Sequence, residues 1–258
     1  MEYLLFRLYG PMASWGEIAV GESRHTAVKP TKSALLGLLG AALGVGRDNE
    51  GGQEALNKGY HFAIRVLSTG QLLRDYHTAQ APDSVGKFQY RTRRDELVVG
   101  KTRLGTVLSS REYRTNAQAV IAVRKLEHAK WSLDELKKAL LAPKYHLYLG
   151  RKSCPLAAPL QPEIMTADNY YQAMQSYQPK SLLHDLNSWD SEQRWISDDE
   201  LQRYFWEGCV ADFSQLSAEF NPEQVQQLSQ YDQPLSRDRW QFQPRKEYFW
   251  QVSVMEDI

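Results

Sequence analysis

The chain has 258 residues, of which 42% are hydrophobic, enough for a core in one large domain or two small ones. Glycines interrupt its longest apolar runs, which are far shorter than the roughly 18 residues that a transmembrane helix needs, so no membrane contact is expected. Glu2 and Arg7 lie where a signal peptide would be apolar, which indicates a cytoplasmic protein. Only Cys154 and Cys209 are present, outside any CxxC pair, which argues against a disulfide framework and a structural zinc site.

The formal net charge of zero hides an uneven distribution along the chain. From residue 159 onward there are seven Lys and Arg against seventeen Asp and Glu, whereas residues 1–158 hold 24 against 14. A basic half is typical of proteins that bind a polyanion, because each cation placed against a phosphate releases condensed counterions. An acidic half fits a water-exposed surface or a basic protein partner better. A charge distribution without a function remains the alternative.

The basic half predicts a regular order of strands and helices. Strands are predicted at 3–10, 61–68 and 118–126 from their apolar or alternating pattern, and helices at 30–44 and 132–143. A last strand is expected near the second helix. The resulting β-α-β-β-α-β order is typical of the ferredoxin-like or RNA-recognition-motif (RRM) class, an α+β fold whose antiparallel sheet carries helices on one face.

The first helix, PTKSALLGLLGAALG, contains an unusual number of glycines. Thr31 or Ser33 is the expected N-cap, and Gly44 is one candidate for the residue that ends the helix. Gly37, Gly40 and Gly44 share one face, and each interior glycine costs about 1 kcal/mol relative to alanine. A close approach to a sheet or another backbone is therefore predicted on that face.

A basic excursion between residues 78 and 117 interrupts this order. From Gly86 to Arg114 there are eight basic residues against three acidic ones, with too little apolar content for a separate core. Because DELVVG (95–100) and TRLGTVLSS (102–110) have strand character, we predict an extended basic β-hairpin. Such a hairpin would suit gripping a phosphate backbone or wedging between bases. A solvated hairpin without a ligand is the alternative.

The acidic half predicts a second region after a core of residues 1–160. Residues 162–233 are expected to form an acidic helical insertion, with SDDELQRYFWEG (197–208) as a capped helix whose aromatic side chains point inward. RWQFQPRKEYFWQVSV (239–254) is expected to close the chain as β-structure within the region 161–258. Aromatic residues in an acidic segment indicate core or a protein interface.

Enzyme signatures are mostly missing from the sequence. There is no phosphate-binding P-loop, no GxGxxG and no HExxH, so no cofactor and no metal are expected. Cys154, followed by Pro155, is predicted to be an inert packing residue rather than a nucleophile. Metal-free RNA cleavage would need only a base for the ribose 2′-OH and cationic or phenolic help. The candidates for those roles are His25, His77, Tyr76, Lys32 and Tyr148, although histidines on an RNA-binding face more often stack or hydrogen-bond.

Several long motifs identify a known family. They are RLYGPMASWG (7–16), PTKSALLGLLGAALGVGRD (30–48), RDYHT (74–78), SREY (110–113), YLGRKSCPL (148–156), and the DQPL and EYFW pieces near the end. With these motifs the chain resembles the CasD-type subunits of type I-E CRISPR surveillance complexes, called Cascade. The resemblance implies an RRM-like core with a β-hairpin thumb, a non-catalytic subunit that holds the 5′ handle of the CRISPR RNA (crRNA), and a thumb that displaces a guide nucleotide. It also implies three partners: the backbone subunit, the large subunit that recognises the PAM, and target DNA through the complex.

The resemblance also implies which residues meet the RNA. Arg111 and Tyr148 match positions that contact handle bases, and Arg151 and Lys152 fit contacts with phosphates or with the hook of the handle. The other residues expected on the handle side are Gly150, through close backbone approach, and Arg24, Lys32, His25, Trp15 and His77. The thumb from 86 to 103 and the segment 162–233 look longer than in the family, and we expect the latter to dock a neighbouring protein. An endoribonuclease that processes precursor crRNA, as some relatives in other subtypes do, is the alternative function.

Overall fold

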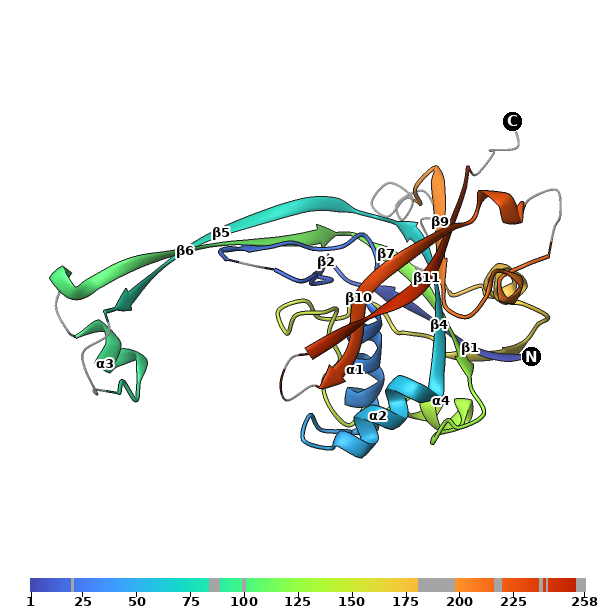
Figure 1. The fold of residues 1–258 in the computed structure, drawn as a ribbon, viewed down its shortest axis with the longest axis horizontal. Coiled ribbons are helices and arrows are strands. Elements are labelled where there is room, and N and C mark those ends of the chain that lie inside the picture. The colour runs from blue at the N-terminus through green and yellow to red at the C-terminus, as the bar shows by residue number, and fades with distance from the viewer. Residues whose placement is uncertain are drawn as a thin grey trace.

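An antiparallel sheet of seven strands forms the centre of the protein, seen in a computed structural model (Figure 1). The structure describes residues 1–19, 21–83, 89–98, 101–180, 198–215, 220–236, 239 and 241–253. The strand order is β10-β11-β9-β4-β7-β1-β8. The strand bounds are Glu2–Tyr9 for β1, Tyr60–Ser68 for β4, Gln118–Lys125 for β7, Glu163–Thr166 for β8, Leu201–Trp206 for β9, Gln226–Ser236 for β10 and Gln241–Ser253 for β11.

The strands and helices of the basic half follow the predicted order. The helices of this part are α1 (Lys32–Leu43), α2 (Glu50–Gly59) and α4 (Leu133–Leu141). Thr31 caps α1, and Ser132 with Glu135 forms a capping box at α4. In both helices the cap side chain accepts a hydrogen bond from a backbone N–H that the first turn leaves without a partner. The predicted strands and both helices are confirmed, as is the α+β class. Helix α2 was not predicted, because its glycine-rich sequence EGGQEALNKG has weak helix propensity.

The three glycines of α1 have three different surroundings. A Cβ at Gly40 would lie 3.4 Å from Leu56 of α2, so this glycine allows the two helices to pack closely. Gly44 ends the helix in the left-handed conformation with φ 77°. Gly37 is exposed, and a Cβ there would meet no atom within 4 Å. The prediction of close packing is therefore correct for Gly40 and wrong for Gly37.

Both faces of the central sheet are covered by protein. One face of β1, with Leu4 and Phe6, joins a cluster that includes residues of α1, α2 and α4. The other face, with Tyr3 and Leu5, joins a cluster that includes α5 (Tyr170–Ser176) and aromatic residues of β9 and β11. A strand buried on both faces reads as a continuous apolar run, which explains the sequence of β1. A ligand must therefore bind elsewhere than on the middle of this sheet.

A long two-stranded ribbon projects from the body (Figure 1). It consists of β5 (Gln71–Pro82) and β6 (Leu104–Thr115), paired without interruption from Gln71 opposite Thr115 to Pro82 opposite Leu104. At its base β6 also pairs with β2 (Met12–Ala13) and, in parallel, with β3 (Ser23–Arg24). The far end holds α3 (Arg93–Leu97) and a short 3₁₀ helix at Lys101–Arg103. The predicted hairpin is confirmed, but its first strand begins seven residues earlier than expected, and DELV lies in or next to α3 rather than in a strand.

The acidic segment differs from its prediction. The helix predicted at 197–208 is wrong, because residues 201–206 form β9 between β4 and β11. Tyr204 and Trp206 lie two residues apart in LQRYFW and are buried in the same cluster. This alternation is a strand signal, but the acidic start SDDE resembles a helix N-cap and obscured it. In the described part of 162–233 the structure has one α-helix, α5, beside strands and the short 3₁₀ helices Val210–Asp212 and Pro222–Gln224. The domain division at residue 160 and the docking of a neighbouring protein by residues 162–233 stay predictions. Trp189 and Trp195, two aromatic residues of this segment, lie outside the described residues.

A buried group of charges joins the two halves of the chain. Lys29 contacts Glu247 at 3.0 Å, and Arg245 contacts Glu247 at 2.8 Å and Asp232 at 2.6 Å. Asp232 also accepts a hydrogen bond of 2.6 Å from the backbone N–H of Lys32 at the start of α1. Hydrogen bonds from Arg245 help to hold the pKa of Asp232 below its usual value even though burial raises it. Part of the opposite charge of the two halves is therefore neutralised inside the protein.

Candidate nucleic-acid interface

The interface is built where the loop 10–16 meets the loop 148–156. The backbone N–H of Ser14 donates to the carbonyl of Leu149 at 3.0 Å, and Ser14 Oγ donates to the carbonyl of Glu112 on β6. Gly150 has φ 83°, and a Cβ there would lie 1.8 Å from the carbonyl oxygen of Ser14. Only glycine fits this contact, because both the left-handed backbone and the available space exclude a side chain. The glycine thus brings the basic residues that follow it against the base of the ribbon.

Three arginines meet on one face of the ribbon base. Arg24 of β3 and Arg111 of β6 are register partners, and side chains at paired positions point to the same face of a sheet. Tyr113 lies two residues along β6, hence on that same face, and the guanidinium of Arg151 lies 5.0 Å from the centre of its ring. We call Arg24, Arg111 and Arg151 the arginine row. Its members come from three separate segments, which sequence alone could not bring together.

The arginine row has unused hydrogen-bonding capacity. Nη1 of Arg151 is buried and has no hydrogen-bond partner in the described part of the chain. A buried donor without a partner is costly, but this nitrogen is shielded from solvent and cannot itself meet an anion at the surface. Arg111 pairs with Asp75 of β5 across the edge of β6 opposite to β3. The carboxylate of Asp75 contacts His77. The row is therefore a cationic surface with one carboxylate at its edge.

The opposite face of the ribbon base carries a second charged group. Glu112 is buried and contacts Arg74 at 2.9 Å and His25 at 3.2 Å, so it joins β5, β6 and the residue after β3. Burial raises the pKa of Glu112, but hydrogen bonds from Arg74 and His25 outweigh it and leave the pKa below its usual value. His25 is thus held by a carboxylate on the face away from the arginine row. The contacts of Glu112 thus connect both strands of the ribbon to the residue that follows β3.

Two of the predicted interface residues are buried. Trp15 belongs to the main hydrophobic cluster, so its ring cannot stack on a base without leaving the core. Lys32 does not lie on the arginine row: its side chain is 6% exposed, and its Nζ contacts Glu207 at 3.1 Å. The charge of Lys32 is therefore already paired inside the protein, which argues against the predicted RNA contact, and that contact stays a prediction. The sequence gives no sign of the pairing, because Glu207 is 175 residues away.

The remaining predicted residues lie on or near the surface. Lys152 is exposed in the turn after Gly150, and His77 is exposed farther out on β5. Cys154 is fully buried in the same turn, where its backbone carbonyl accepts from Leu149, and burial raises the pKa of its thiol. The expectation that Cys154 packs rather than reacts is supported by this burial. No cluster of three or more potential metal ligands occurs among the described residues.

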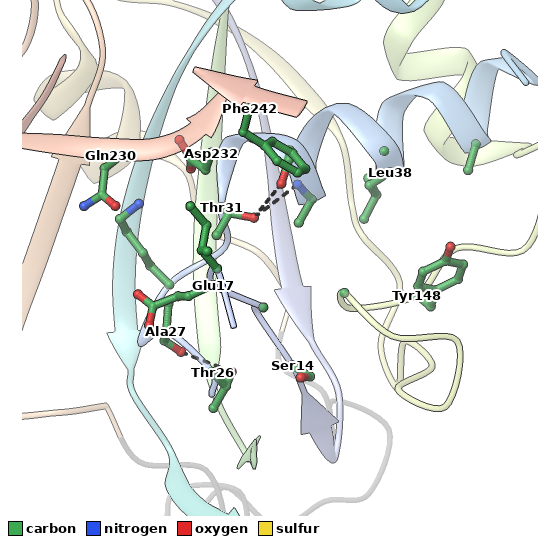
Figure 2. Close-up of a pocket in the computed structure, with 18 of the residues that line it drawn as sticks. Ser14, Glu17, Thr26, Ala27, Thr31, Leu38, Tyr148, Gln230, Asp232 and Phe242 are labelled. Carbon is green, nitrogen blue, oxygen red and sulfur yellow. Dashed lines mark hydrogen bonds between the residues drawn. The ribbon is translucent and has the colours of Figure 1, made fainter. Parts of the chain in front are cut away.

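Tyr148 lines a large groove next to the arginine row. The groove encloses about 1080 Å³ between the loop 145–150, the exposed face of α1 and strand β10. Figure 2 shows Tyr148 and Gln230 on opposite sides of this space, with Thr31 and Phe242 between them in that view. Sequence reasoning missed the groove, Tyr113 and Glu112. Alternation in SREYR could have separated Arg111 and Tyr113 from Glu112, but nothing in the sequence signals the groove.

Comparisons with known proteins identify the class. The family model described as "CRISPR-associated protein (Cas_Cas5)" matches residues 3–248. A solved structure described as "CRISPR RNA-guided surveillance complex" has TM-score 0.60 at 24% identity, covering 98% of this chain and 90% of that chain. Another, described as "Crystal structure of Cas protein", has TM-score 0.52 at 22% identity, covering 97% and 94%. The fold is therefore that of a CRISPR-associated protein.

The family follows from the sequence match as well. The CRISPR system Cascade subunit CasD of Escherichia coli (strain K12) is 38% identical over 187 residues, which are 69% of this chain and 77% of that protein. The chain belongs to the Cas5 family of CRISPR-associated proteins. The resemblance stated from the motifs is thus confirmed. In the described part of the chain, no helix is long and apolar enough to cross a membrane.

Proposed function

We propose that this chain is a non-catalytic RNA-binding subunit of a Cascade-type surveillance complex, where it holds the 5′ handle of the crRNA. The observation that carries the proposal is the arginine row, which presents three guanidinium groups on one face of the ribbon base. Guanidinium groups suit phosphate because their planar donors pair with two oxygens at once. The similarity to CasD, a Cascade subunit, supports the assignment of the complex.

The core supports the same proposal. β4, β7, β1 and β8 are neighbours in that order, and α1 and α4 pack together beside β1 in one cluster. We assign these elements to a ferredoxin-like, RRM-like unit. Because protein covers the middle of both sheet faces, RNA would follow the ribbon base and its loops instead. Unstacked bases held by loops and aromatic side chains are the usual mode of single-stranded RNA recognition.

The ribbon is the proposed thumb. β5 and β6 are each twelve residues long and carry exposed apolar side chains, among them Leu72, Tyr76 and Val107. A narrow ribbon of this kind could separate a guide nucleotide from its neighbours and contact an adjacent backbone subunit. The large PAM-recognising subunit and target DNA are the further proposed partners, with target sequence read by base pairing. A cytoplasmic location fits this role.

Salt dependence of RNA binding tests the proposal. The full-length chain is titrated with a single-stranded RNA that carries the repeat-derived 5′ segment, at several salt concentrations. Arg111→Ala and Arg24→Ala should each weaken binding and reduce the slope of log K against log salt by about 1. Lys58→Ala is the matched control, because this exposed lysine on α2 pairs only with the nearby Glu54 in the described structure. Equal slopes for all variants would contradict the role of the row.

A cleavage assay tests the non-catalytic part. The chain is incubated with a repeat hairpin RNA in the presence of a chelator of divalent metal ions, and the products are separated on a gel. We expect no cleavage above a no-protein control. Cleavage that is lost on His77→Ala or Tyr148→Phe would instead establish the metal-independent endoribonuclease. Purifying the chain with its partner subunits and sequencing the bound RNA would show which handle it holds.

A further inference from the structure

The segment 145–147 lines a second pocket besides the large groove. This pocket encloses about 660 Å³, and the residues that line it include Leu140, Pro143, Tyr145, Pro155, Leu156 and Pro159. We call it the proline pocket. We propose that it docks a segment of a partner protein that carries a large apolar side chain next to carboxylates. The inference goes beyond the proposed function, because it concerns a protein partner rather than RNA, and it rests on that function only for the complex that supplies the partner.

Exposed apolar side chains surround the proline pocket. Leu141 is 64% exposed and lies in the chain between Leu140 and Pro143, which both line the pocket. Tyr145 lines the pocket and is 57% exposed. Exposing large apolar side chains to water is unfavourable, and a group of them around a hollow is typical of a surface that another molecule covers.

Backbone hydrogen bonds hold the walls of the proline pocket in place. The N–H of Lys144 donates to the carbonyl of Ala42 in the last turn of α1 at 3.0 Å. In the loop 155–160, the N–H of Ala157 donates to the carbonyl of Tyr9 at the end of β1 at 3.1 Å. The three prolines of the lining restrict the backbone further. A surface that is already ordered loses little conformational entropy on binding, which favours a docking site.

The charge around the proline pocket is positive. Lys144 lines the pocket, is exposed and has no carboxylate partner among the described residues. Lys137 lies one turn before Leu141 on α4, so these two side chains share a face of the helix. None of the residues that line the pocket is acidic, and Asp134 and Glu135 lie in the first turn of α4, at its other end. Carboxylates beside an apolar anchor would complement this rim.

The lining suits a protein side chain better than a nucleobase. Aliphatic and proline side chains offer no hydrogen-bonding groups to a base edge, and Tyr145 is the one Phe, Tyr or Trp ring in the lining. Single-stranded RNA is held by aromatic stacking and by hydrogen bonds to base edges. An apolar side chain needs only apolar area and a matching shape. The volume of 660 Å³ lies within the range of roughly 300–1,000 Å³ that is common for binding pockets.

Photo-crosslinking identifies the occupant. The crosslinking residue p-benzoylphenylalanine replaces Tyr145, the chain is purified together with its partner subunits, and crosslinked peptides are sequenced by mass spectrometry after irradiation. We expect one protein segment that contains a large apolar residue with Asp or Glu close to it in sequence. The same crosslinker at Leu235 is the control, because Leu235 on β10 is 63% exposed and does not line the pocket. Crosslinks only to RNA, none to a protein, or the same segment from both positions would overturn the inference.

Substitutions at the rim measure what the contact contributes. The subunit that the crosslink identifies is purified and titrated against the chain. Leu141→Gln should weaken binding on the order of tenfold, as the loss of an apolar anchor does, whereas the equally exposed Leu235→Gln should bind like the wild type. Lys144→Gln should weaken binding about threefold at low salt and less as salt is raised, because the contact is electrostatic. Equal affinity of Leu141→Gln and Leu235→Gln would overturn the inference.

RNA titration separates this site from the RNA interface. Leu141 lines neither the proline pocket nor the large groove, so Leu141→Gln should keep the RNA affinity and the thermal midpoint of the wild type. A Leu141→Gln protein that binds the partner normally but has lost RNA affinity would assign this surface to RNA and overturn the inference. A wild type that binds no RNA would contradict the proposed function, while the crosslink and the partner titration would still decide the docking site.

Discussion

Replacing Lys32 by methionine distinguishes a buried structural charge from an RNA contact. Methionine keeps the length and apolar stem of the side chain but removes the ammonium that contacts both carboxylate oxygens of Glu207, at 3.1 and 3.2 Å. Both side chains are 6% exposed, so Glu207 would lose a partner in a place that water does not reach. The substitution therefore tests stability and binding separately.

The expected loss follows from the contacts that remain. Breaking a buried ion pair by removing one partner costs about 3–5 kcal/mol, because the other charge is left without compensation. Glu207 would keep Arg245 at 3.2 Å and the backbone N–H of Phe62 at 3.3 Å, so the cost belongs at the lower end, about 3 kcal/mol. At this chain length that free energy corresponds to a decrease of roughly 6–12 °C in the thermal midpoint.

Thermal unfolding and RNA titration together provide the assay. Lys32→Met should lower the midpoint as stated, while the folded protein, titrated well below that midpoint, keeps wild-type RNA affinity and salt slope. The double variant Lys32→Met/Glu207→Met removes one charge of each sign and should recover most of the loss. A Lys32→Met protein with an unchanged midpoint and a lower salt slope would refute the reasoning. Lys32 would then contact RNA, as the sequence suggested.

Three further predictions concern single residues. Because the pKa of Glu112 is lowered in the folded protein, its carboxylate stabilises the fold above about pH 4.3, and this contribution is lost as pH falls through the folded-state pKa. Glu112→Gln removes the titrating carboxylate, so the thermal midpoint of this variant should decrease less between neutral and acid pH than that of the wild type. In the native protein a maleimide should label the exposed Cys209 and not the buried Cys154, as mass spectrometry of the peptides would show; equal labelling would contradict the packing role. Gly150→Ala should lower stability by more than about 1 kcal/mol in urea unfolding and weaken RNA binding, since its Cβ would overlap the carbonyl of Ser14; wild-type values for both would contradict the close contact.

Local sequence determined the elements whose signals are local. The caps Thr31 and Ser132 fix where α1 and α4 begin, and runs of apolar and β-branched residues indicate β4 and β7. The hairpin was also predictable, because a basic excursion with strand character and no core of its own has few other stable forms. Short motifs spread along the chain, among them the one around Gly150, identified the family. All of these depend on residues close together in the chain.

Tertiary structure decided which charges remain at the surface. In the basic half, Lys29 and Lys32 are buried and paired with carboxylates that lie far along the chain. A count of charges in the sequence therefore overstates the basic surface of this half. Arg24 and Arg111 become neighbours only through the parallel pairing of β3 with β6. Residues 201–206 form a strand that pairs with β4 on one side and β11 on the other, although the sequence before it resembles a helix cap. Pairing between distant segments depends on space and desolvation, and a single sequence does not record either.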